Sequence, residues 1–335
     1  MVRRSRLSSV LLVTLVGPMP IAGQDSNIFL PVSEIEERLS SQLFEVRSMR
    51  TSRGLPSERT YTPTVRFEDG TMLWLKFAPA PRGGEVFNNR PQYEVAAYQL
   101  QKLFLDESEY VVPPTVARCF PFDFVEQALN KAPNRDAIED PLPTFDGWRM
   151  SLVVLQYWLW NTDVADRDDI RDRERLENDE AFARHAGNFN LLTYLIRHND
   201  SNAGNFLIST DPANPRIFSV DNGIAFSALF SEESARGTYW RELRIERFPA
   251  TSIERLRTLT LEDLRAALGV VAQFEFSRDG DFVAVDATEN LDPDKGIRRT
   301  PTVLQLGLTA SEIRNIHRRL TRLIDQVDDG KYEVF

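Results

Sequence analysis

The chain has 335 residues, of which 42% are hydrophobic and 27% are charged, so it can bury one large core or two smaller ones and is not a disordered protein. Its net charge of -10 argues against nonspecific nucleic-acid binding, because such binding needs a basic surface that displaces phosphate counterions. The single cysteine, Cys119, excludes an intramolecular disulfide, and the core of a domain of this size does not need one.

The N-terminal segment has the order basic, apolar, small that is typical of a secretory signal peptide. Three arginines lie within the first six residues, the apolar run 10–16 follows, and cleavage is expected after Ala22 or Gly23. An uncleaved anchor and a buried N-terminal helix are the alternatives, but this apolar run is too short to span a bilayer comfortably. We therefore predict a signal peptide over residues 1–23 and a periplasmic or secreted protein with no transmembrane segment in the mature chain.

The first half of the mature chain is predicted to form a mostly antiparallel sheet with one helix. A first helix is expected over residues 32–39. Strands are expected over residues 43–47, 61–67, 71–77, 115–120 and 150–158. The Glu68-Asp69-Gly70 segment is a hairpin turn signal between the second and third strands. Pro91 suits the first turn of a helix that runs through residues 94–104.

The second half is predicted to be mainly helical. The densely charged run 163–180 indicates a solvated helix or loop, or the seam between two lobes. A helix with apolar residues at helical spacing follows and leads directly into His198. Two more amphipathic helices, over residues 261–268 and 313–324, begin with capping patterns.

Two loops in this half carry carboxylates and an amide at a spacing that suits phosphate and metal chemistry. In His198-x-Asp200-x-x-x-x-Asn205, turn residues let the loop fold back so that the carboxylate and the amide approach one point. Asp221 follows the apolar run 217–220, and Gly223 allows a sharp turn behind it. Oxygen ligands of this kind suit Mg²⁺. The alternative is that these residues only cap backbone amides in surface loops, which explains each residue but not their order.

The order of strand lysine Lys76, helix glutamate Glu94 and these two loops resembles the protein-kinase-like superfamily. The likeness spans nearly the whole mature chain and is closest to its atypical branch, which holds the phosphatidylinositol 3- and 4-kinases, above all the type II 4-kinases, and the HipA-type kinases. Type II lipid kinases carry Asp-x-x-x-x-Asn-Trp-Leu-Ile and Asp-Asn-Gly-Leu-Ala-Phe motifs. Here the segment 200–208 begins with Asp and ends in Asn-Phe-Leu-Ile. The segment 221–226 reads Asp-Asn-Gly-Ile-Ala-Phe.

The resemblance implies an α+β fold with two lobes, an antiparallel sheet plus a helix over residues 27–160 and a mainly helical lobe over residues 161–335. It implies an ATP- and Mg²⁺-dependent kinase that phosphorylates a hydroxyl on a lipid headgroup, a protein or a small polyol. The implied roles are phosphate contact for Lys76, orientation of Lys76 for Glu94, the catalytic carboxylate for Asp200, and Mg²⁺ binding for Asn205 and Asp221.

Other interpretations of the same residues stay open. A strand lysine can be a solvent-facing residue with a packed stem, and a glutamate near a helix start can serve the helix dipole alone. The expected glycine-rich phosphate loop is absent before Lys76, where residues 52–57 hold a single glycine. A pseudokinase or nucleotide-binding module without turnover is therefore the main alternative. A third possibility is a secreted effector kinase that works inside another cell.

His198 is expected to support its loop by hydrogen bonds to the backbone. His185 and His317 lie in predicted helices without metal-ligand spacing, so zinc is not expected.

Overall fold

The computed structural model describes residues 25–51, 60–86, 89–200, 202–226, 239–277 and 280–335. The expected signal peptide and the segment 52–57 lie outside these ranges. Helices and several antiparallel sheets alternate along the described chain. This confirms the α+β class.

The first half of the chain forms a five-stranded antiparallel sheet in the order β1-β2-β3-β5-β4. Its strands are β1 (Phe44–Ser48), β2 (Thr64–Phe67), β3 (Met72–Pro79), β4 (Thr115–Pro121) and β5 (Met150–Tyr157). Their bounds lie within about three residues of the predicted ones, because alternating apolar residues and the Gly70 turn mark them well. Gly70 has φ +88° in the β2–β3 hairpin, a conformation that favours glycine.

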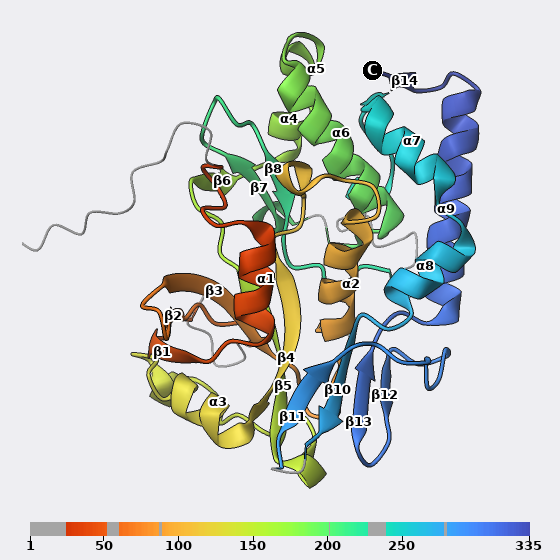
Figure 1. Ribbon diagram of the computed structural model, residues 1–335. Coiled ribbons are helices and arrows are strands. Elements are labelled where there is room, and N and C mark those ends of the chain that lie inside the picture. The colour runs from red at the N-terminus through yellow and green to blue at the C-terminus, as the bar shows by residue number, and fades with distance from the viewer. Residues whose placement is uncertain (1–24, 52–59, 87–88, 201, 227–238, 278–279) are drawn as a thin grey trace, which may run out of the picture.

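Three helices accompany this sheet: α1 (Val32–Ser40), α2 (Pro91–Gln101) and α3 (Phe122–Leu129). α2 begins at Pro91 and ends three residues before the predicted end, where the Gln101 side chain accepts hydrogen bonds from the amides of Val111 and Val112. Nearly every side chain of α2 is buried, as expected for a helix enclosed by other elements. It contacts β4 and β5 on one side and α6 and α8 on the others (Figure 1).

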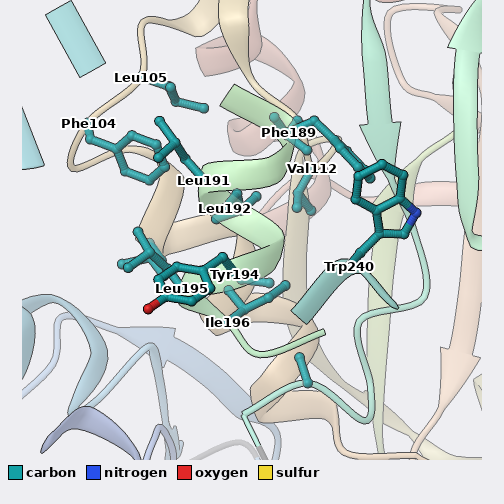
Figure 2. Packing of buried hydrophobic residues seen from close by; sticks show 14 of the residues in the cluster. Phe104, Leu105, Val112, Phe189, Leu191, Leu192, Tyr194, Leu195, Ile196 and Trp240 are labelled. Carbon is teal, nitrogen blue, oxygen red and sulfur yellow. The ribbon is translucent and has the colours of Figure 1, made fainter. Parts of the chain in front are cut away.

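Helices of the second half surround a core centred on α6 (Glu180–Leu195). The other helices of this half are α4 (Arg167–Ile170), α5 (Arg173–Asn178), α7 (Ala250–Thr258), α8 (Leu261–Leu268) and α9 (Ala310–Asp328). Figure 2 shows Leu191, Leu192 and Leu195 of α6 in the same buried cluster as Phe104, with Phe189 beside Trp240. Because α6 is buried all round from Ala186 to Leu195, the loop that follows it starts from a rigid support.

A small sheet carries the two loops of interest. Its strands are β6 (Thr162–Val164), β7 (Phe206–Ser209) and β8 (Ile217–Ser219), paired antiparallel in that order. The segment 198–205 leads into β7, and Asp221 follows β8 by two residues. Since Phe206 pairs with Ser219, the two loops leave the same end of the β7–β8 pair.

The second half also contains a four-stranded sheet, so the prediction of a mainly helical half was incomplete. The strands, in the order β11-β10-β13-β12, are β10 (Ala272–Phe276), β11 (Phe282–Val285), β12 (Ile297–Arg299) and β13 (Val303–Leu306). Apolar runs this short do not separate strand from helix. β10 and β11 contact β4, and Phe274, Leu304 and Leu306 share a buried cluster with Cys119 and Leu152 of the first sheet.

The remaining strands, β9 (Arg247–Phe248) and β14 (Glu333–Val334), form a parallel pair near the C-terminus. Among the described residues, no helix combines the length and the apolarity needed to cross a membrane.

Candidate functional site

A buried ion pair between β3 and α2 forms the base of the candidate site. Lys76 lies on β3, between β2 and β5, and its Nζ donates to Glu94 Oε1 of α2 at 2.8 Å. Both side chains are almost fully buried. Burial raises the pKa of Glu94, with Lys76 partly offsetting the effect. For Lys76, burial alone would lower the pKa, but the charges of Asp221 and Glu94 outweigh it and raise the pKa.

Asp221 brings a second carboxylate to the same lysine. Its Oδ1 lies 3.4 Å from Lys76 Nζ, and 55% of its side chain is exposed. The positive charge of Lys76 holds the pKa of this carboxyl below its usual range. Asp221 has φ +60°, in the left-handed region, and Arg197 and Phe226 also have positive φ. Such conformations cost energy in residues other than glycine and gather at functional sites.

The backbone amide of Asn222 holds the second carboxylate oxygen of Glu94. Asn222 N donates to Glu94 Oε2 at 3.0 Å, while its side-chain Oδ1 accepts from Ser219 Oγ at 3.0 Å. Glu94 therefore links the strand lysine to the loop that carries Asp221. The sequence did not identify this contact, because a backbone donor leaves no signature in residue type.

The 198–205 loop lies next to the Asp221 loop through the backbone. Val220 N donates to Asn205 O at 2.8 Å. Asn205 is therefore bonded to the residue that directly precedes Asp221. Within the loop, Asp200 Oδ1 accepts from Asn202 N at 3.2 Å, and Asn205 Nδ2 donates to the Asp200 carbonyl at 3.3 Å. The first of these bonds is the Asx-turn chemistry considered above as an alternative role.

His198 departs from its expected role as a hydrogen-bonding support. Its ring is buried 5.1 Å from the Phe206 ring, and neither ring nitrogen has a hydrogen-bond partner among the described residues. Its backbone amide donates to Thr193 O at 2.9 Å. Burial lowers the pKa of the ring to about 4, although Asp200 and Asp221 oppose this. His198 therefore packs as a neutral aromatic ring.

The donor set suits a hard cation better than zinc. Asn205 and Asp221 supply one amide and one carboxylate oxygen, the ligand types that Mg²⁺ takes when phosphate oxygens and water complete its shell. No group of three or more His, Cys, Asp and Glu side chains in the described ranges is arranged to hold a metal by itself. A metal at Asn205 and Asp221 would therefore depend on a phosphate-bearing ligand.

The structure brings all five sequence-predicted residues into one region. Lys76, Glu94 and Asp221 are in direct contact, Asn205 is tied to the residue before Asp221, and Asp200 is tied to Asn205. They come from four segments far apart in the sequence. Compared with known proteins, the chain matches no family model and no curated protein sequence.

Proposed function

We propose that this protein is a phosphotransferase that uses ATP and Mg²⁺ to phosphorylate a hydroxyl, with a bilobal kinase-like fold. The observation that carries the proposal is the contact of Lys76 with Glu94 and Asp221, two carboxylates from separate elements. Export by the signal peptide over residues 1–23 is part of the same proposal. A lipid headgroup, a protein side chain and a small polyol are the acceptor classes considered.

In this proposal each residue has a role that follows from its surroundings. Lys76, kept charged and held by Glu94, would contact the phosphates of the nucleotide. Asn205 and Asp221 would hold Mg²⁺, which neutralises negative charge on the β- and γ-phosphates when bound. Asp200 lies in a partly exposed loop and would orient the acceptor hydroxyl and accept its proton. The half-exposed Asp221 carboxylate is accessible to a ligand without disturbing the Lys76–Glu94 pair.

Nucleotide binding is tested by thermal unfolding with ATP and Mg²⁺ compared with ATP and EDTA. We expect Mg²⁺-dependent stabilisation of about 2.7 kcal/mol at a ligand concentration 100 times its dissociation constant. Asp221→Ala removes a metal ligand and should abolish the Mg²⁺-dependent part. If that variant keeps the full Mg²⁺-dependent stabilisation, the metal assignment is wrong.

Turnover is tested by transfer of labelled phosphate from ATP into lipid, protein and small-molecule fractions. Asp200→Ala should abolish transfer. Asp211→Ala is the matched control, because Asp211 Oδ1 also accepts an Asx-turn bond, from Ala213 N at 2.9 Å, in the loop at the other end of β7 and β8. Equal loss in both variants would mean that Asp200 serves only its turn.

The second candidate is a nucleotide-binding module without turnover. The single glycine in residues 52–57 favours it, because backbone amides that grip phosphate usually come from a glycine-rich loop. This module would show Mg²⁺-dependent stabilisation by ATP and no labelled product in any fraction. The two measurements above therefore separate it from the kinase.

A further inference from the structure

A polar cavity of about 330 Å³ lies between the end of α6, the segment that follows the 3-10 turn Tyr239–Arg241, and the C-terminal half of α9. Four of its lining residues are cations and one is an acid. They are Arg241, Arg244, Arg322, Lys331 and Glu242. In a chain with a net charge of -10, this is a local excess of positive charge.

Three of these four cations have no carboxylate partner in the described part of the chain. Within the described ranges, Arg244, Arg322 and Lys331 have no carboxylate within 4.0 Å, whereas arginines elsewhere, such as Arg257 with Asp328, are paired at 2.7 Å. Arg241 makes only a long contact, from its Nε to Glu242 Oε1 at 3.7 Å. Like charges that converge without counter-charges repel one another, and a bound anion relieves that repulsion.

Arg241, which lines the same cavity, also carries a buried hydrogen-bond donor. Only 12% of its side chain is exposed, and its Nη1 is buried with no acceptor among the described residues. A buried N–H of a charged group without an acceptor is costly. An anion in the cavity would meet the exposed part of this guanidinium, and arginine presents parallel donors that suit two-point binding.

We propose that this cavity binds a small phosphate monoester, whether soluble or as a lipid headgroup. The volume accommodates a phosphate group with a small organic substituent, since ligand pockets of this type start at about 300 Å³. Tyr194, Gln326 and Tyr332 line the same cavity and offer neutral polar groups next to the cations. The site is separate from Lys76 and does not depend on the proposed kinase activity.

The test is calorimetric titration with inorganic phosphate and with glycerol 3-phosphate at constant ionic strength. The double variant Arg244→Gln/Arg322→Gln should weaken binding by at least about tenfold, because it removes two charge-assisted contacts. Arg314→Gln is the matched control, an exposed arginine on α9 that does not line the cavity, and should change the affinity less than about twofold.

Phosphate can also meet Lys76, so the titration is repeated with Lys76→Met, in which the affinity at the cavity should be unchanged. Loss of binding in Lys76→Met with retention in the double variant would overturn the proposal. So would phosphate binding no tighter than chloride. Sedimentation with phosphatidylcholine vesicles that contain phosphatidic acid separates the two sources: co-sedimentation that the double variant loses indicates a lipid headgroup, and soluble binding alone indicates a free monoester.

Discussion

The two ends of β8 each hold a charged contact to the first half of the chain, and the two contacts are built differently. At the start, the Arg216 guanidinium is fully buried, pairs with Asp25, donates to Tyr110 O at 2.7 Å and lies over the Phe218 ring. At the other end, Asp221 meets Lys76 but leaves 55% of its side chain exposed. The first contact is enclosed by protein, and the second stays open to a ligand.

The difference gives a criterion, the exposure of one partner, that separates an ion pair with a structural role from one that is accessible to a ligand. Arg216 is held by Asp25, the Tyr110 carbonyl and the Phe218 ring, although its Nε has no acceptor among the described residues. Its charge therefore serves contacts between the two halves of the chain. At Lys76, one carboxylate is buried and fixed by an amide, and the other is accessible. A ligand can bind the exposed carboxylate and so change the charges around Lys76. An enclosed ion pair is out of reach of a ligand while the protein stays folded.

The largest expected effect is on phosphate transfer at the open contact. Lys76→Met removes the cation that we propose contacts the nucleotide phosphates, and we expect transfer to fall by at least about 10³-fold, equivalent to about 4 kcal/mol in the activation barrier. Transfer is measured per folded molecule, with folding checked by circular dichroism. Arg216→Met should keep transfer within about threefold per folded molecule. Similar losses in both variants would remove the distinction between the two ends of β8.

The next effect is on stability at the enclosed contact. Arg216→Met removes the donor to Asp25 Oδ2 and to the Tyr110 carbonyl, although Asp25 Oδ1 keeps the amides of Asn27 and Ile28, and we expect the free energy of unfolding to fall by about 3 kcal/mol. The measurement is urea unfolding at neutral pH. Arg47→Met is the control, because Arg47 and Glu45 are both about half exposed and such pairs contribute less than about 1 kcal/mol. Equal losses in both variants would contradict the prediction.

The smallest effect is the part of the pH dependence of stability that His198 contributes at the open end; burial also lowers the pKa of His185 on α6, to about 3. Burial holds the pKa of His198 at about 4 in the folded state, below about 6.5 in an unfolded chain. As the pH falls, the unfolded state therefore binds a proton before the folded state does. The contribution of neutral His198 to stability is complete above pH 6.5 and is lost as the pH falls toward 4. The free energy of unfolding changes with pH by at most about 1.4 kcal/mol per pH unit from this group.

His198→Phe should flatten this slope between pH 6.5 and 5 in urea unfolding, because the variant keeps an aromatic ring beside Phe206 and removes the titrating group. The ring nitrogens of His198 have no partners among the described residues, so the substitution breaks no described side-chain hydrogen bond. Equal slopes in the two proteins would show that another group causes the pH dependence.

The sequence predicted best where the signal is local. The hairpin at Gly70, the helix that begins at Pro91 and the loops at Asp200 and Asp221 are set by residues close together in the chain. The C-terminal sheet was missed because its strands are short and depend on partners up to about thirty residues away. The amide of Asn222 on Glu94 and the cations around the α9 cavity were missed because only the folded chain brings them together.

The packing of the C-terminal sheet against β4 has a consequence during synthesis. β4 ends at residue 121, and β10, which covers it, begins at residue 272, 151 residues later (272 − 121). At about 5–20 residues per second, the apolar side chains of β4 wait roughly 8 to 30 seconds for their cover to be made. In the folded chain Cys119 of β4 packs in one buried cluster with Phe274 and Leu304, so this apolar face of the strand has no cover from that sheet throughout the interval.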